Sequence, residues 1–247
     1  MKKIILVVTP LAVGAFLFLF GAFQGQSDNR SLLRFATCAD YPPFEYMRGG
    51  ELVGFDIELA REIAKDLGSE AEFLDVPFSS VLVAVDSGLA DMAIATITKT
   101  TMREQSFDFS EPYYTECLAM VYYADAPIES AAQLEGKKIA CQLGTTMELW
   151  LKEHVPSAAI VATDSNPQAI EMLKAQHVDG VYIDCTQAVE FCAVNPELQY
   201  KPIAHADTGY AVAFKKESAL KDRVNASLKR LEAAGVIARL RKTYVGS

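Results

Sequence analysis

The sequence is poor in the side chains that usually build metal centres and nucleic-acid interfaces. Its three histidines are scattered, and its five cysteines form neither a CxxC motif nor a Cys/His spacing, so a zinc site has no support. The formal net charge of −9 argues against non-specific binding to nucleic acid or to an anionic membrane. This acidic balance favours a cationic or zwitterionic partner. Repeats and low-complexity stretches are also absent.

The 247 residues allow one large domain or two modest ones, and an apolar content of 51% is ample for a core. Five cysteines leave at least one unpaired in an oxidising compartment, unless a partner chain supplies another. Cys185 and Cys192 would lie on one helix, roughly 10 Å apart along its axis, which is too far for a disulfide.

The N-terminus carries the features of an export signal. Lys2 and Lys3 precede an apolar run over residues 4–23, and polar residues follow from Gln24. We expect residues 1–27 to be a signal peptide. Because the run is about as long as the ~20 residues that span a bilayer, and no small-x-small cleavage site follows Phe20, an uncleaved membrane tether is the alternative. Both interpretations place the body outside the cytoplasm, in the periplasm or its equivalent.

Hydrophobic periodicity predicts strands that alternate with helices. The predicted strands cover residues 34–37, 71–76, 92–97, 118–124, 137–142, 160–162 and 181–183. The predicted helices cover residues 55–67, 81–86 with Ser79 or Ser80 as the cap, 146–153, a segment from 165, 185–192 and 218–244. The alternation is typical of an α/β fold with a largely parallel sheet. An irregular aromatic passage over residues 107–114 separates two such runs, which indicates two lobes.

The ends of the predicted strands carry the chemistry of a zwitterion site. In open α/β sheets, ligands bind beyond the carboxyl ends of strands. There Arg103 can hold a carboxylate through two hydrogen bonds, helped by the Thr98 hydroxyl and by backbone N–H groups at Thr146. Asp184 can accept hydrogen bonds from an ammonium, and Tyr41 can face an apolar stem. No hydrolytic machinery accompanies them.

Each of these residues also has a purely structural interpretation. Arg103 can be the partner of a surface ion pair, and Asp184 can be the N-cap of the helix over 185–192. Phe78 can belong to the core. We expect Glu45 and Asp56 to be structural acids of the first lobe.

Four segments resemble a known family: residues 35–59, 94–103, 107–114 and 142–146. They are similar, in the same order, to the extracytoplasmic solute-binding proteins of polar amino-acid ABC transporters, and the motif FAT-x-A-x-YPPFE is most similar to that of arginine binders. The resemblance implies a type II periplasmic-binding-protein fold, in which each lobe is a mixed, mostly parallel sheet flanked by helices. It implies lobe 1 over 28–116 plus 211–247, lobe 2 over 117–210, and a two-strand hinge near 115–117 and 208–211.

The resemblance also implies a ligand site and partners. The expected ligand-binding residues are Cys38, Tyr41, Phe78, Thr96, Thr98, Arg103, Thr145, Thr146 and Asp184. Arg103 would take the ligand carboxylate and Asp184 the ammonium, while Tyr41 and Phe78 would enclose the side chain. Cys38 stands where basic-amino-acid binders often carry an acid. The implied ligand is a polar L-amino acid, with arginine or another basic amino acid favoured. The implied partner is an ABC permease, and the protein is expected to be monomeric, without a cofactor.

Two other functions and one cysteine pairing stay open at this point. The first is a cyclohexadienyl dehydratase-like enzyme on the same scaffold, which needs a general acid and a second cationic anchor, such as Lys99 with Glu116 or Glu148. The second is a membrane-tethered amino-acid sensor. We also hypothesise that Cys38 and Cys185, on opposite lobes, form a disulfide that locks the cleft.

Overall fold

A computed structural model describes residues 31–205 and 208–246 of the chain. The predicted signal peptide or membrane tether, residues 1–27, lies outside the described residues. Among the helices of the described part, none has the length and apolar character needed to cross a membrane.

The first sheet contains the N-terminal strand and receives a strand from near the C-terminus. Its strands are β1 (Ser31–Thr37), β5 (Ser69–Asp75), β6 (Met92–Ala93), β7 (Phe107–Phe109) and β13 (Ala213–Lys215). They follow the order β5-β1-β6-β13-β7. Strands β5 and β6 run parallel to β1, whereas β13 runs antiparallel to β6 and β7. The first sheet is therefore built from both ends of the described chain.

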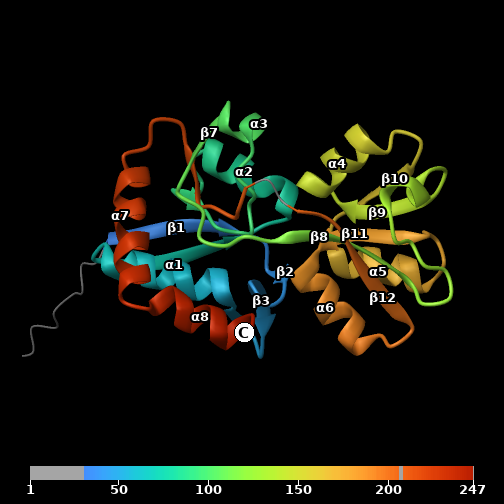
Figure 1. The fold of residues 1–247 in the computed structure, drawn as a ribbon. Helices are drawn as coiled ribbons and strands as arrows, with labels where there is room; N and C mark the ends of the chain where they lie inside the picture. The colour runs from blue at the N-terminus through green and yellow to red at the C-terminus, as the bar shows by residue number, and fades with distance from the viewer. Residues whose placement is uncertain (1–30, 206–207, 247) are drawn as a thin grey trace, which may run out of the picture. The chain divides into compact units, whose positions relative to one another are not determined.

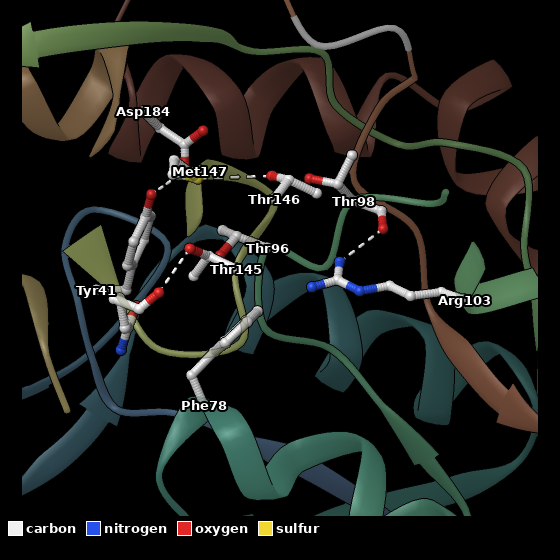
Figure 2. A pocket seen from close by; sticks show the side chains of 10 residues that line it. Tyr41, Phe78, Thr96, Thr98, Arg103, Thr145, Thr146, Met147 and Asp184 are labelled. Carbon is white, nitrogen blue, oxygen red and sulfur yellow. Dashed lines mark hydrogen bonds between the residues drawn. The ribbon is translucent and has the colours of Figure 1, made fainter. Parts of the chain in front are cut away.

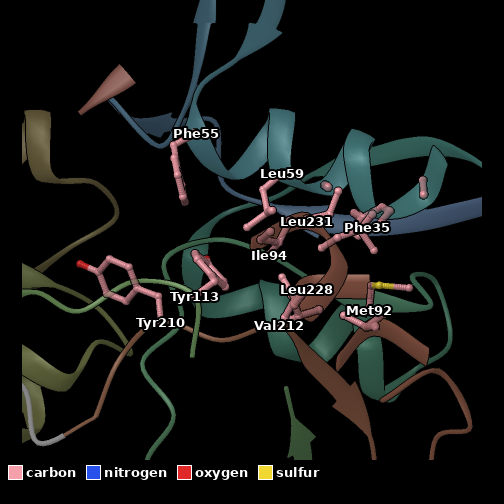
Figure 3. Packing of buried hydrophobic residues seen from close by; sticks show 14 of the residues in the cluster. Phe35, Phe55, Leu59, Met92, Ile94, Tyr113, Tyr210, Val212, Leu228 and Leu231 are labelled. Atoms are coloured by element: carbon pink, nitrogen blue, oxygen red, sulfur yellow. The ribbon is translucent and has the colours of Figure 1, made fainter. Parts of the chain in front are cut away.

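Side-chain alternation along β1 gives the first sheet two apolar faces. Phe35 packs into a core with α1 (Phe55–Asp66), α7 (Leu220–Ala233) and α8 (Val236–Tyr244), and Figure 3 shows Leu228 and Leu231 of α7 in this core. The next residue, Ala36, faces the opposite core beneath α2 (Phe78–Asp86). This period of two is the pattern expected for a strand buried on both faces.

The second sheet repeats the arrangement with the middle of the chain. Its strands are β8 (Cys117–Tyr123), β9 (Lys138–Gln142), β10 (Ala159–Thr163), β11 (Gly180–Asp184) and β12 (Leu198–His205), in the order β10-β9-β11-β8-β12. The 3-10 turn η1 (Ala131–Leu134) precedes β9. Helix α4 (Thr146–His154) packs into one core of this sheet, and α5 (Asn166–Lys174) and α6 (Cys185–Val194) pack into the other (Figure 1).

The chain passes between the two sheets twice. It leaves the first sheet between β7 and β8 and returns between β12 and β13. The two passages pair where the Tyr210 N–H donates to the Tyr114 carbonyl at 2.8 Å. A Cβ on Gly209 would lie 2.1 Å from that same carbonyl oxygen, so only glycine fits there. Two α/β sheets joined by two paired passages confirm the predicted fold class.

Several boundaries differ from the predictions. Helix α2 begins at Phe78 with Pro77 as its N-cap, so the predicted start at Val81 was wrong. The predicted helix over 218–244 is two helices, because Gly235 adopts a φ of 70° between α7 and α8. Strand β6 stops at Ala93, short of the predicted end at residue 97.

Short strands were also missed. An antiparallel sheet of β2 (Asp40–Tyr41), β3 (Glu45–Arg48) and β4 (Glu51–Val53) occupies a segment in which no strand was predicted. Strand β7 lies within the passage predicted to be irregular. The short helix α3 (Thr101–Glu104), between β6 and β7, was not predicted either.

The disulfide prediction was wrong in its partner. Cys185 bonds to Cys117, with their Cα atoms 5.4 Å apart, whereas Cys38 is a buried free thiol. The antiparallel register of β11 and β8 sets Asp184 opposite Leu118, so Cys185, which follows Asp184, comes next to Cys117, which precedes Leu118. The Cys38 thiol instead donates to Asp40 Oδ1 at 3.2 Å.

Candidate functional site

The strand ends of both sheets converge on one small cavity. Its lining consists of Tyr41, Phe78, Thr96, Thr98, Arg103, Gln142, Thr145, Thr146, Met147 and Asp184. Eight of the nine residues predicted from the sequence are therefore brought together (Figure 2). The cavity measures about 10 Å³, about the space of one water, and two of its lining side chains, Tyr41 and Asp184, hydrogen-bond to each other.

Arg103 is the cation of this cavity. It lies on α3, only 8% exposed, and its own backbone N–H is held by the N-cap hydroxyl of Thr100. The guanidinium donates to the Thr98 carbonyl at 2.7 Å and to the Gly144 carbonyl at 3.0 Å, and it lies 5.8 Å from the centroid of the Phe78 ring. Burial lowers the pKa of Arg103 to about 10, so it is still charged at neutral pH.

Asp184 is the anion of the cavity and comes from the second sheet. It is 4% exposed and stands at the N-cap position of α6, yet its side chain makes no capping hydrogen bond. The Tyr41 hydroxyl donates to Asp184 Oδ2 instead, and Figure 2 shows the Tyr41 ring pointing at that carboxyl. Burial raises the pKa of Asp184 to about 7, although the bond from Tyr41 opposes the shift.

The turn between β9 and α4 is held by its own side chains. The Thr145 hydroxyl donates to the Gln142 carbonyl at 2.6 Å and caps α4 by accepting from the Glu148 N–H. The Glu148 carboxylate accepts from the Gly144 N–H at 2.8 Å. These contacts fix the Gly144 carbonyl that Arg103 reaches, and they leave Thr146 at the cavity wall.

Cys38 does not line this cavity. It lies beside a neighbouring depression of about 310 Å³, together with three carboxylates, Asp40, Asp75 and Asp164. The sequence analysis missed two lining residues, Gln142 and Met147. Gln142 ends a predicted strand and Met147 follows Thr145 and Thr146, so the strand-end rule had already reached both positions.

The described residues hold one group with metal-ligand spacing, formed by Glu116, Cys117 and Cys185. Both sulfurs belong to the disulfide, so this group offers a single carboxylate. The Glu116 carboxylate accepts from the Thr186 hydroxyl and from the Cys117 N–H.

Two α/β sheets joined by two passages, with a cavity lined from both, define a type II periplasmic binding protein. Residues 33–247 match the bacterial extracellular solute-binding proteins, family 3, and the chain belongs to this family.

Similar proteins were found by sequence and by structure. The arginine-binding extracellular protein ArtP of Bacillus subtilis (strain 168) is 34% identical over 250 residues, covering 99% of this chain and 98% of ArtP. An ancestral arginine-binding protein bound to arginine has a TM-score of 0.84 at 32% identity, over 88% of this chain and 99% of that one. The ancestral amino acid-binding protein AncCDT-1, a precursor of cyclohexadienyl dehydratase, has a TM-score of 0.82 at 29% identity, over 87% of this chain and 96% of that one.

Proposed function

We propose that this protein binds a polar L-amino acid in the cavity described above, outside the cytoplasm, and delivers it to an ABC permease. One observation carries the proposal: a single buried guanidinium and a single buried carboxyl line the same small cavity. A buried charge is tolerated when it is paired, and an amino-acid zwitterion supplies the partner for both groups at once.

The ligand's two charges assign the residues. Arg103 would bind the α-carboxylate with the Thr98 hydroxyl and with the N-terminus of α4 at Thr146. Asp184 would accept from the α-ammonium after Tyr41 gives up its hydrogen bond. The Tyr41 and Phe78 rings would flank the side-chain stem, and Thr96 and Thr145 would complete the wall.

A basic amino acid, and arginine first, is the ligand we favour. The depression beside Cys38 carries the carboxylates of Asp40, Asp75 and Asp164, which would attract a guanidinium at the end of an extended side chain. Asp40, two residues from Cys38, would then replace the acid that is missing at Cys38. The relatives named for arginine point the same way.

Closure of two lobes would be the mechanism. Residues 28–116 with 211–247 would form lobe 1 and residues 117–210 lobe 2, with the Tyr114 and Tyr210 passages as the hinge. Arg103 reaches the Gly144 carbonyl and Tyr41 reaches Asp184, so hydrogen bonds already join the two proposed lobes. Ligand would shift the populations toward this closed form, which the permease would recognise. We expect the transport protein to be a periplasmic monomer.

Binding without turnover is favoured over an enzyme. A dehydratase would need a general acid and a second cationic anchor, and the sequence offered Lys99 with Glu116 or Glu148 for these roles. Lys99 instead pairs with Glu104 at 3.2 Å, and none of these groups belongs to the cavity lining. The likeness to AncCDT-1 keeps prephenate in the test.

Calorimetric titration of the purified protein, freed of ligand by unfolding and refolding, tests the function. The panel is the twenty amino acids, ornithine, citrulline and prephenate. We expect tight binding of one basic or polar amino acid without its consumption. Consumption of prephenate with no heat from any amino acid would replace the proposal with an enzyme.

The Arg103→Ala variant tests the residue assignment. Removing one partner of a desolvated charge pair costs about 2–5 kcal/mol, so the affinity should fall about 30-fold to several thousand-fold. Lys99→Ala is the matched control, since Lys99 is a nearby cation outside the cavity lining, and it should keep the wild-type affinity. Equal affinities for Arg103→Ala and wild type would remove Arg103 from the site.

A further inference from the structure

Two buried acids lie directly behind the cavity wall. Glu45 of β3 is 1% exposed and Asp56 of α1 is fully buried. The two carboxyls lie against each other, and burial raises the pKa of both, that of Asp56 to about 6. Among the neighbouring titratable side chains, Asp40 acts on Glu45 and the Tyr113 hydroxyl donates to Asp56, while Glu45 in turn acts on Tyr41 and on Cys38. None of these four neighbours is a cation.

Each carboxyl has one satisfied oxygen and one without a partner. Asp56 Oδ2 accepts from the Thr96 N–H at 2.8 Å and from the Tyr113 hydroxyl at 2.7 Å, and Glu45 Oε1 accepts from the Thr96 hydroxyl at 3.3 Å. Glu45 Oε2 and Asp56 Oδ1 have no hydrogen-bond partner. Two ionised carboxylates in contact would repel each other, whereas one shared proton would supply a donor between the two partnerless oxygens.

Both satisfied oxygens hold the same residue, Thr96. Its φ of 47° is rare for a β-branched residue and persists only when surrounding contacts fix it. The pair supplies these contacts, one to the N–H and one to the hydroxyl. Thr96 in turn lines the cavity, and it follows closely after the end of β6.

We propose that Glu45 and Asp56 share one proton and act together as positioning residues that hold Thr96 in its ligand-binding conformation. The inference rests on the proposed function, because Thr96 is taken as part of the ligand site. The shared proton makes the pair a single negative charge rather than two, and this keeps the strained turn intact at neutral pH.

The first test needs no ligand. Infrared difference spectra of wild type against Glu45→Gln, recorded near pH 8.5 where Asp184 is ionised, should show one protonated-carboxyl band in wild type only. The amide of Glu45→Gln keeps an acceptor for Thr96 and offers an N–H to Asp56 Oδ1, so it replaces the shared proton. Glu51→Gln, an exposed acid on the adjacent β4, should keep the band. A spectrum of Glu45→Gln that still contains the band would overturn the shared proton.

The second test uses L-arginine as the probe at the same pH. The affinity of Glu45→Gln should lie within about twofold of wild type. The affinity of Glu45→Ala should be about tenfold or more weaker, since Thr96 loses its acceptor and the shared proton loses one of its two carboxyls. Equal affinities for Glu45→Ala and wild type would overturn the positioning role, and so would Glu45→Gln binding as weakly as Glu45→Ala. If neither the wild type nor the variants bind any amino acid, the proposed function fails, while the infrared result on the pair still stands. If Glu45→Ala does not fold, the Glu45→Gln spectrum and affinity still decide.

Discussion

We expect Asp184, the proposed site for the ligand ammonium, to make ligand binding pH-dependent. Burial raises its pKa from 3.8 to about 7 in the closed cavity, where Tyr41 is its hydrogen-bond donor. An ammonium bound there would favour the charged form of the carboxylate, so ligand would lower this pKa. Binding below about pH 7 must therefore release a proton, and affinity falls as the pH falls.

The magnitude follows from the pKa of the carboxyl in the closed form without ligand. With a value of about 7, about nine-tenths of Asp184 is protonated at about pH 6 and nearly all of it at about pH 5. The apparent dissociation constant should then rise about tenfold at pH 6 and about a hundredfold at pH 5, relative to its plateau above about pH 8. The plateau is where the carboxylate is fully available to the ammonium.

Calorimetry measures both sides of this linkage. Titration of L-arginine in buffers of different ionisation enthalpy should report nearly one proton released near pH 6 and almost none near pH 8. Asp184→Asn should lose about 2–5 kcal/mol of affinity at pH 8 and show a flat profile below it. Asp125→Asn, an exposed acid of the same part of the chain, should follow wild type. A wild-type affinity that stays constant from pH 5 to 8 would refute the reasoning, and so would an Asp184→Asn variant with the wild-type pH profile.

Two further predictions concern the passages between the sheets. The Cys117–Cys185 disulfide closes a separation of 68 residues, so its loss should cost about 2–4 kcal/mol and lower the Tm by roughly 5–15 °C. A reductant should produce this shift in wild type and leave a Cys117→Ala/Cys185→Ala double variant unchanged; equal Tm values with and without reductant in wild type would contradict it. Gly209→Ala places a Cβ 2.1 Å from the Tyr114 carbonyl oxygen, so we expect the free energy of unfolding to fall by about 1–3 kcal/mol, as measured by thermal unfolding. An unchanged Tm would contradict this prediction and show that the passage can shift.

The fold was predictable because its elements have strong local signals. The helix over 55–67 was placed within one residue of α1, since its apolar spacing and the following Gly68 both mark it. The short elements were missed because they lack such local signals. Strands β2, β3 and β4 have only two to four residues each, so they offer no period to detect. Strand β6 was predicted at its start, but it has two residues, and its end was placed too late.

The candidate site was predictable where strand ends meet, and less so where pairing depends on register. The strand-end rule and the motif order located Arg103, Asp184 and Tyr41 in one cavity. Gln142 and Met147 were passed over because their residue types carry no charge that requires a partner. The Cys117 pairing needs the antiparallel register of β8 and β11, which no local pattern contains.

The ionisable groups around the cavity also explain why a zwitterion fits it better than a singly charged ligand. Arg103 already donates to two carbonyls, and Asp184 already accepts from Tyr41. A carboxylate alone would pair Arg103 and leave Asp184 buried with a pKa near 7; an ammonium alone would leave Arg103 without an anion. A ligand that presents both charges would exceed what the protein's own contacts supply, and this excess would be the free energy available for the proposed closure of the lobes.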